Sequence, residues 1–197
     1  FNSLRLQIQT VNRGIVVVHS VQQGTDWFDN PVETSGQYAG AVIARTPQEL
    51  VIMTPENAVE HADSIKVTFF DGQEVDGRMK QKDSISGMAI VSVNLGDLAE
   101  ETRDKVQELI LGNSYKVREG DLVVAVGGPS GMVYSVDYGF VSYISKNTQM
   151  VDRNNRVIYT DLSTNVSVGT FLVNTAGGLI GWAMEPRQES GGGIERM

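Results

Sequence analysis

The chain is divided into short apolar runs, and residues that favour turns bound each of them. The apolar positions are rich in Val, Ile and aromatic side chains, which pack well on the pleated surface of a sheet. The runs cover residues 14–20, 39–44, 49–54, 64–70, 87–93, 121–127, 139–145, 156–161, 169–174 and 178–184. Short runs at this regular spacing predict an all-β barrel or sandwich.

The connections between these runs carry their own signals. In FFDGQEV (69–75), Asp71 and Gly72 accept positive φ angles, so we predict a hairpin with a tight primed turn. Helical spacing is assigned only to residues 96–110, which are predicted to connect two β modules. The Gly-rich segment VGGPSG (126–131) lacks the Lys and the following helical pattern of a phosphate-binding loop, and is therefore predicted to be a strand-to-strand turn.

Composition excludes several classes of function. A chain of 197 residues, 41% of them hydrophobic, can bury a full core. The chain has 24 acidic and 16 basic residues with no cluster of Lys and Arg, which makes nucleic acid an unsuitable partner. It has no Cys, so disulfides and thiolate chemistry are excluded. No stretch approaches the roughly 18 apolar residues of a membrane-spanning helix.

A series of motifs follows the order found in one known family. The motifs are SGQYAGAVIA (35–44), ELVIMTPENAVEHADSIKV (49–67), SGMAIVSV (86–93), REGDLVVAVGGPSGMVYSVDYGFVS (118–142) and YTDLSTNVSVGTFLVNTAGGLIGW (159–182). Together they resemble the protease domain of trypsin-like serine proteases of the HtrA/DegP type. This resemblance implies a trypsin-like double β-barrel, with two Greek-key barrels in the chymotrypsin fold. It places an N-terminal barrel at 1–105, a C-terminal barrel at 106–185 and a flexible Gly-rich tail at 186–197.

The resemblance also locates the catalytic positions, and none of them carries the residue that the family uses. The general base His aligns with Asn57 and the orienting Asp with Gly87. The nucleophilic Ser aligns with Val168, or with Gly169 when residues are counted forward from YTD. An amide accepts no proton near neutral pH, and Gly and Val offer neither an orienting nor an attacking group. The resemblance therefore predicts vestigial triad positions and a catalytically inactive pseudoprotease.

A rearranged catalytic site is the alternative. His61 lies four residues after Asn57 and Ser167 lies one residue before Val168, with Asp161 or Asp63 available to orient the imidazole. Such a constellation would make the chain an active trypsin-like serine endopeptidase. The simpler interpretation makes His61 a solvated turn residue and Ser167 a loop hydroxyl.

Three other segments contain residue types that occur in binding sites. His19 falls at the end of a Val-rich strand pattern, where an ordinary strand residue is expected rather than a metal ligand. VDRNNR (151–156) lacks the spacing of a calcium loop and is predicted to be a polar β-turn. DWFDNP (26–31) is either an exposed aromatic anchor for a partner or a loop that folds its aromatics onto the first barrel, and the second is favoured. No metal and no cofactor is expected.

The resemblance implies a function in binding rather than in catalysis. It predicts a domain that accepts a peptide or protein partner, or that regulates one. A third hypothesis is a structural subunit that pairs with an active relative. HtrA-type proteins are commonly extracytoplasmic, at the cell surface or in the periplasm, and form oligomers. Many carry an N-terminal membrane tether and a C-terminal PDZ domain, so the resemblance implies these features for a longer chain.

Overall fold

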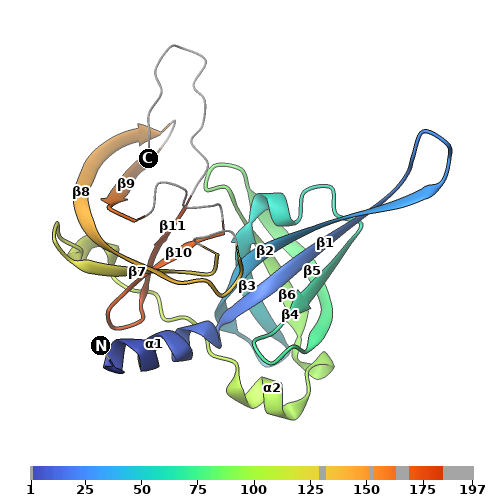
Figure 1. Cartoon of the computed structure of the whole chain (residues 1–197), viewed down its shortest axis with the longest axis horizontal. Helices are drawn as coiled ribbons and strands as arrows, with labels where there is room; N and C mark the ends of the chain where they lie inside the picture. The colour runs from blue at the N-terminus through green and yellow to red at the C-terminus, as the bar shows by residue number, and fades with distance from the viewer. Residues whose placement is uncertain (1, 129–131, 151–152, 163–168, 184–197) are drawn as a thin grey trace.

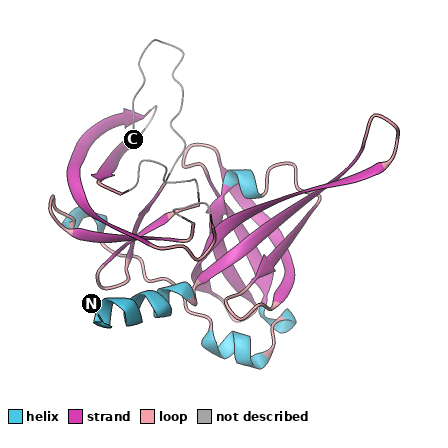
Figure 2. Ribbon diagram, viewed as in Figure 1, coloured by secondary structure: helices cyan, strands magenta, loops and turns pink. Residues whose placement is uncertain are grey.

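The computed structural model describes residues 2–128, 132–150, 153–162 and 169–183. The strands form two groups that lie side by side (Figures 1 and 2). The first is a closed barrel in the order β1-β2-β3-β6-β5-β4. Its strands are β1 (Ile15–Thr25), β2 (Pro31–Arg45), β3 (Glu49–Pro55), β4 (Ser64–Thr68), β5 (Glu74–Asp83) and β6 (Met88–Asn94).

The second group is a five-stranded sheet in the order β11-β10-β7-β8-β9, which curves into half a barrel. Its strands are β7 (Leu122–Val126), β8 (Asp137–Met150), β9 (Arg153–Thr160), β10 (Phe171–Asn174) and β11 (Leu179–Trp182). Each apolar run of the sequence coincides with a strand, so the all-β prediction is confirmed. Gly127 and Gly128 begin the connection between the antiparallel strands β7 and β8, as predicted, and residues 129–131 of VGGPSG lie outside the described residues.

The helical segments differ from the prediction. They are α1 (Asn2–Asn12), η1 (Glu56–Ala58), η2 (Leu95–Asp97), α2 (Glu100–Lys105) and η3 (Ser114–Lys116). The helix expected over 96–110 is wrong beyond residue 105, because the next N–H groups bond to other segments: Gln107 donates to the Arg13 carbonyl and Leu109 to the Val42 carbonyl. Helix α1 was not predicted, although Ile8 and Val11 lie on one face and are buried. Within the described residues, no helix is long and apolar enough to cross a membrane.

Two turns also need correction. The Asp71–Gly72 hairpin joins β4 to β5 as predicted, but only Gly72 has a positive φ, of 88°. Gly72 N–H bonds to the Phe69 carbonyl and Phe69 N–H to the Gln73 carbonyl, which is a three-residue loop closed by a glycine bulge rather than a primed turn. The polar turn expected over 151–156 is shorter, because β9 begins at Arg153; residues 151–152 lie outside the described residues.

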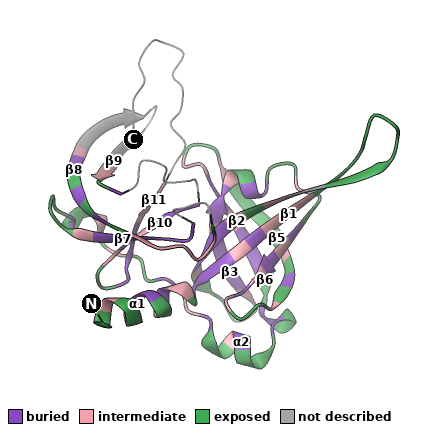
Figure 3. Cartoon of the chain, in the orientation of Figure 1, coloured by how far each residue is buried: buried purple, intermediate pink, exposed green. Residues whose placement is uncertain are grey.

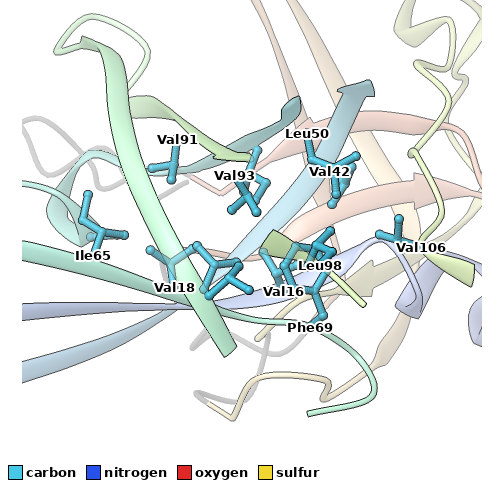
Figure 4. Packing of buried hydrophobic residues seen from close by; sticks show 14 of the residues in the cluster. Val16, Val18, Val42, Leu50, Ile65, Phe69, Val91, Val93, Leu98 and Val106 are labelled. Atoms are coloured by element: carbon cyan, nitrogen blue, oxygen red, sulfur yellow. The ribbon is translucent and has the colours of Figure 1, made fainter. Parts of the chain in front are cut away.

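The interior of the first barrel is filled by alternate residues of its strands (Figure 4). Val16 and Val18 of β1 and Val91 and Val93 of β6 are fully buried, as the two-residue period of a strand requires. Phe69, which follows β4, closes the same cluster. The barrel is therefore a packed core, and a binding site has to lie outside it.

A second buried cluster is shared by the two groups of strands. It joins Ile15, Ala39 and Met88 of the barrel to Val126 and Phe171 of the second sheet. Because apolar burial is the dominant favourable term in folding, this cluster fixes how the two halves face each other. The domain boundary at residues 105 and 106 stays a prediction, and the tail at 186–197 lies outside the described residues.

Tyr134 links the halves by a hydrogen bond. Its hydroxyl donates to the Ile15 carbonyl over 2.8 Å, and burial raises the pKa of Tyr134 to about 12. An unfolded tyrosine ionises near pH 10. Between pH 10 and 12 the unfolded chain loses this proton while the folded chain keeps it, so the free energy of unfolding falls as the pH rises.

Tyr134→Phe should therefore change both the stability and its pH dependence. We expect the free energy of unfolding to drop by about 1 kcal/mol at neutral pH, because the hydrogen bond is lost. We also expect a shallower loss of stability between pH 10 and 12, because the phenyl ring has no proton to release. Urea denaturation of both proteins across this range measures the two effects, and equally steep losses would contradict the assignment.

Candidate active site

The turn that carries Asn57 follows β3 directly. Thr54, at the end of β3, is fully buried, and its hydroxyl donates to the Ala39 carbonyl over 3.0 Å. The η1 turn then buries Ala58 and Val59 in the barrel core and leaves Asn57 exposed. The fold thus presents the residue at position 57 to solvent at the rim of the barrel.

The turn that carries Gly87 is held against the Asn57 turn. Glu56 N–H donates to the Gly87 carbonyl over 2.8 Å, and the Ser84 hydroxyl donates to the Glu56 carboxylate over 2.9 Å. Gly87 has a φ of 71°, in the left-handed region that L-residues with a side chain avoid. The structure therefore brings the two positions together, as the family pattern requires, with no ionisable side chain at either one.

Gly169 comes to the same place from the second sheet. A Cβ atom built on Gly169 would lie 3.5 Å from Pro55 Cγ and 3.6 Å from Ala39 N. Gly169 has a φ of 95° and is buried. The three segments predicted to bear the triad thus meet where the halves join. Val168, the alternative position for the nucleophile, lies outside the described residues.

The described residues of the rearranged site contact other groups rather than one another. The His61 side chain is 76% exposed, and its Nε2 lies 3.8 Å from a Glu60 carboxylate oxygen. Both candidate orienting carboxylates bind backbone N–H groups: Asp63 accepts from Gln23 over 2.7 Å and Asp161 from Phe140 over 2.5 Å. Ser167 lies outside the described residues, so its pairing with His61 stays a hypothesis.

Trp182 is a residue of this region that the sequence analysis missed. It ends β11, and its indole N–H donates to the Ser86 carbonyl, next to Gly87, over 3.2 Å. The contact spans 96 residues of sequence, so the only signal was an aromatic residue at the end of GLIGW. Trp182 is 39% exposed and so remains accessible beside the turns of Asn57 and Gly87.

Strand β11 is an edge strand of the second sheet, and part of its outer edge has no described strand paired with it. Leu179 N–H donates to the Ile110 carbonyl, and the Leu179 carbonyl accepts from Gly112 N–H. Ala183 N–H instead turns inward, to the Thr170 carbonyl. Because main-chain groups alternate along an antiparallel strand, those of Trp182 point to the outer edge. Among the described strands, none pairs with that edge at Trp182.

Other candidate sites are weaker. A shallow depression of about 200 Å³ is lined by Val117, Asp121, Leu122, Val123, Asn174, Thr175 and Ile180, which belong to the second sheet and its loops and not to the turns of Asn57 and Gly87. His19 lies within β1, with its Nε2 3.3 Å from the Thr68 hydroxyl. Within the ranges that the structure describes, no group of three His, Cys, Asp or Glu residues is placed to hold a metal ion.

Comparison with known proteins identifies the family. A model described as the trypsin-like peptidase domain matches residues 38–181. The chain belongs to the trypsin-like peptidase family. This trypsin-like domain is 30% identical over 166 residues to Serine protease Do-like HtrA of Bacillus subtilis (strain 168), covering 80% of the chain and 35% of that protein. It is 28% identical over 159 residues to Periplasmic pH-dependent serine endoprotease DegQ of Escherichia coli (strain K12), covering 80% and 33%.

The trypsin-like domain spans about one third of the length of these relatives. Among solved structures it matches the HtrA-type protease AlgW with a decapeptide, with a TM-score of 0.72 and 19% identity over 95% of the chain and 60% of AlgW. AlgW with a tripeptide gives a TM-score of 0.69 and 21% identity over 91% and 53%. These likenesses confirm the fold predicted from the sequence, that of an HtrA-type protease domain.

Proposed function

We propose that this HtrA-type domain is a pseudoprotease that binds extended peptides without cutting them. The observation that carries the proposal is the pairing of the Asn57 and Gly87 turns. Their backbones are joined by the hydrogen bond from Glu56 to Gly87, yet neither Asn57 nor Gly87 has a side chain that could take up a proton or orient a catalytic base. The two turns keep the arrangement that the family uses, but they lack its catalytic side chains.

The loss of rate that follows the removal of a catalytic residue supports this proposal. Removing the catalytic Ser or His alone lowers kcat of a serine protease by about 10⁶. What such an enzyme retains, roughly 10³ to 10⁴ over water, comes from the oxyanion hole and from binding. In this chain the segment NVSVGT (165–170) is one residue shorter than the family pattern and carries β-branched Val166 and Val168, so we expect even this remainder to be lost.

The edge of β11 supports peptide binding. An extended peptide adds to an unpaired sheet edge through main-chain hydrogen bonds, and this needs no catalytic residue. Trp182 provides both an outward-facing main chain and an accessible indole beside the vestigial positions. AlgW, which shares the fold, has been solved with a tripeptide and with a decapeptide. We infer that the outer edge of β11 takes the same kind of ligand.

The relatives of the domain support a proposal about its cellular location and its assembly. DegQ of Escherichia coli is named as periplasmic, and we propose an extracytoplasmic location for this domain as well. A homo-oligomer, or pairing with an active relative, would let a domain without catalysis present bound peptides to an enzyme.

Binding to fluorescein-labelled decapeptides of varied sequence tests the proposal. We expect some of them to bind with dissociation constants in the micromolar range, about −8 kcal/mol, and to be recovered intact by mass spectrometry. Trp182→Ala should weaken binding by roughly tenfold, the loss of one central aromatic contact. Tyr143→Ala, which truncates an exposed aromatic of β8, is the matched control and should change nothing. Cleaved peptides, or equal losses in both variants, would overturn the proposal.

A further inference from the structure

The first two strands extend beyond the barrel as a ribbon, which we call the arm (residues 22–40; Figure 1). Strand β1 pairs with β4 only from Val17 to Val21, and β2 pairs with β3 only from Ala41 to Arg45. Beyond these points the two strands pair only with each other, out to Thr25 and Pro31. The arm is exposed along most of its length (Figure 3).

The tip of the arm holds two aromatic side chains in solvent. Trp27 is 96% exposed and Phe28 is 81% exposed, so the favoured prediction that this loop folds onto the barrel is wrong. The reason is the tip's own hydrogen bonds: the Asp26 carboxylate accepts from the N–H groups of Phe28 and Asn30 and from the Asn30 amide. Asp26 N–H also donates to the Asn30 carbonyl. This closed turn fixes the backbone that presents both rings.

The two edges of the arm differ. On β1, the carboxylate of Asp63 accepts from Gln23 N–H, and Asp63 N–H donates to the Val21 carbonyl, so this edge is covered. Both bonds to Asp63 use odd-numbered residues of β1, whose main-chain groups point away from β2. Odd-numbered residues of β1 lie opposite odd-numbered residues of β2. The main-chain groups of those β2 residues therefore point away from β1, to the outer edge of β2. The outward carbonyl of Ala39 accepts a hydrogen bond from the Thr54 hydroxyl. Further out, among the described residues, the main chains of Glu33 and Gln37 face an edge that no strand covers.

The arm carries negative charge alone. Residues 14–44 include Asp26, Asp29 and Glu33 and contain no Lys or Arg. Hydrogen bonds from the Asn30 side chain, and from the Asn30 and Phe28 backbones, hold the pKa of Asp26 below its usual value, so the tip stays charged. An anionic lipid surface would be repelled by the arm, and a second copy would bring another net charge of −8.

We propose that the arm is a docking site for an extended, basic segment of a partner protein, separate from the peptide-binding edge of β11. The backbone of the segment adds to the free edge of β2. Its Lys or Arg side chains lie against the face of Trp27, where a cation is attracted to the ring, and beside the carboxylates of Asp29 and Glu33. The free edge of β2 favours an extended segment, and the negative charge of the arm favours a basic one.

A defined peptide tests this inference by fluorescence anisotropy at low salt. The probe is a fluorescein-labelled peptide of alternating Lys and Thr, and the same peptide with Glu in place of Lys is its control. We expect the Lys peptide to bind and the Glu peptide not to bind. Trp27→Ala combined with Phe28→Ala should weaken binding by roughly tenfold or more, and Asp29→Asn combined with Glu33→Gln by about fivefold.

A third variant tests the strand edge separately. Gln37→Pro removes an outward N–H without touching the pairing to β1, a change that edge strands accept, and should weaken binding by about fivefold. Matched controls lie away from the arm: Tyr138→Ala with Phe140→Ala for the aromatics, and Glu100→Gln with Asp104→Asn for the carboxylates, all of them exposed. These controls should bind like the parent. Equal circular dichroism spectra would show that the arm variants are folded.

The other outcomes each contradict the proposal in a distinct way. Equal losses in the carboxylate controls would mean attraction to net charge alone. Weaker binding in Trp182→Ala, with unchanged binding in the arm variants, would place the peptide at the outer edge of β11. Trp27-dependent sedimentation with phosphatidylcholine vesicles would assign the arm to a lipid surface, and Trp27-dependent dimers in analytical ultracentrifugation would assign it to a second copy.

Discussion

Variants that put back catalytic side chains, Asn57→His alone or together with Gly87→Asp and Val168→Ser, should remain about 10⁵-fold or more below an active HtrA-type protease in kcat/KM. The single variant lacks both a nucleophile and an orienting carboxylate, and triad members act as a unit. The combined variant fails for a backbone reason. Gly87 has a φ of 71° and is fixed by hydrogen bonds at both its N–H and its carbonyl, so a carboxylate placed there starts from a different backbone conformation.

Cleavage of casein and of a fluorogenic peptide, with an active HtrA-type protease assayed in parallel, measures this expectation. Labelling by a fluorophosphonate reports separately on any activated serine. Hydrolysis by the unaltered domain that disappears in both Ser167→Ala and His61→Ala would establish the rearranged site instead. Recovery of activity in the combined variant would show that the scaffold had kept a working geometry.

Gly127→Ala should destabilise the domain severely, by about 3 kcal/mol or more, although it adds only one methyl group. A Cβ atom at Gly127 would lie 2.6 Å from the Gly169 carbonyl oxygen and 3.1 Å from the Phe171 ring. Gly127 also has a φ of 90°, which alone costs roughly 1 kcal/mol for an L-residue. Because the clash is with backbone, the segment at Gly169 has to move to relieve it.

Gly120→Ala is the matched control for this prediction. Gly120 has a φ of 88°, but a Cβ atom there would meet no atom within 4 Å. It should therefore cost only the strain of about 1 kcal/mol, a drop of roughly 2–4 °C in Tm for a domain of this size. Thermal unfolding of both variants compares the two effects. Equal drops would mean that the approach of Gly127 to Gly169 contributes nothing beyond backbone strain.

The strands were predictable from the sequence because burial imposes a two-residue period that local patterns record. Val16 and Val18 flank the less buried Val17, and Leu50 and Ile52 flank the less buried Val51. The arm was not predictable by the same means. Residues 22–33 contain few apolar side chains and are all exposed, so their strands leave no hydrophobic period.

The candidate site was predictable only in part. The resemblance placed Asn57 and Gly87 at aligned positions, and the structure shows that they meet. The left-handed backbone at Gly87 and the hydrogen bond from Trp182 to Ser86 depend on tertiary contacts, which no local pattern encodes. The favoured position of Trp27 was wrong because burial was assumed for an aromatic loop, whereas local hydrogen bonds of Asp26 decide its conformation.

The chain's only two tryptophans lie at the two proposed sites, Trp27 at the tip of the arm and Trp182 beside the vestigial positions. Their environments differ, since one indole is almost fully solvated and the other donates a hydrogen bond to a backbone carbonyl. Emission from Trp27 should be quenched readily by acrylamide, a neutral quencher, and emission from Trp182 less so. Trp27→Phe and Trp182→Phe would each leave a single tryptophan, so with excitation selective for tryptophan the occupancy of the arm and of the β11 edge could be followed independently without a label.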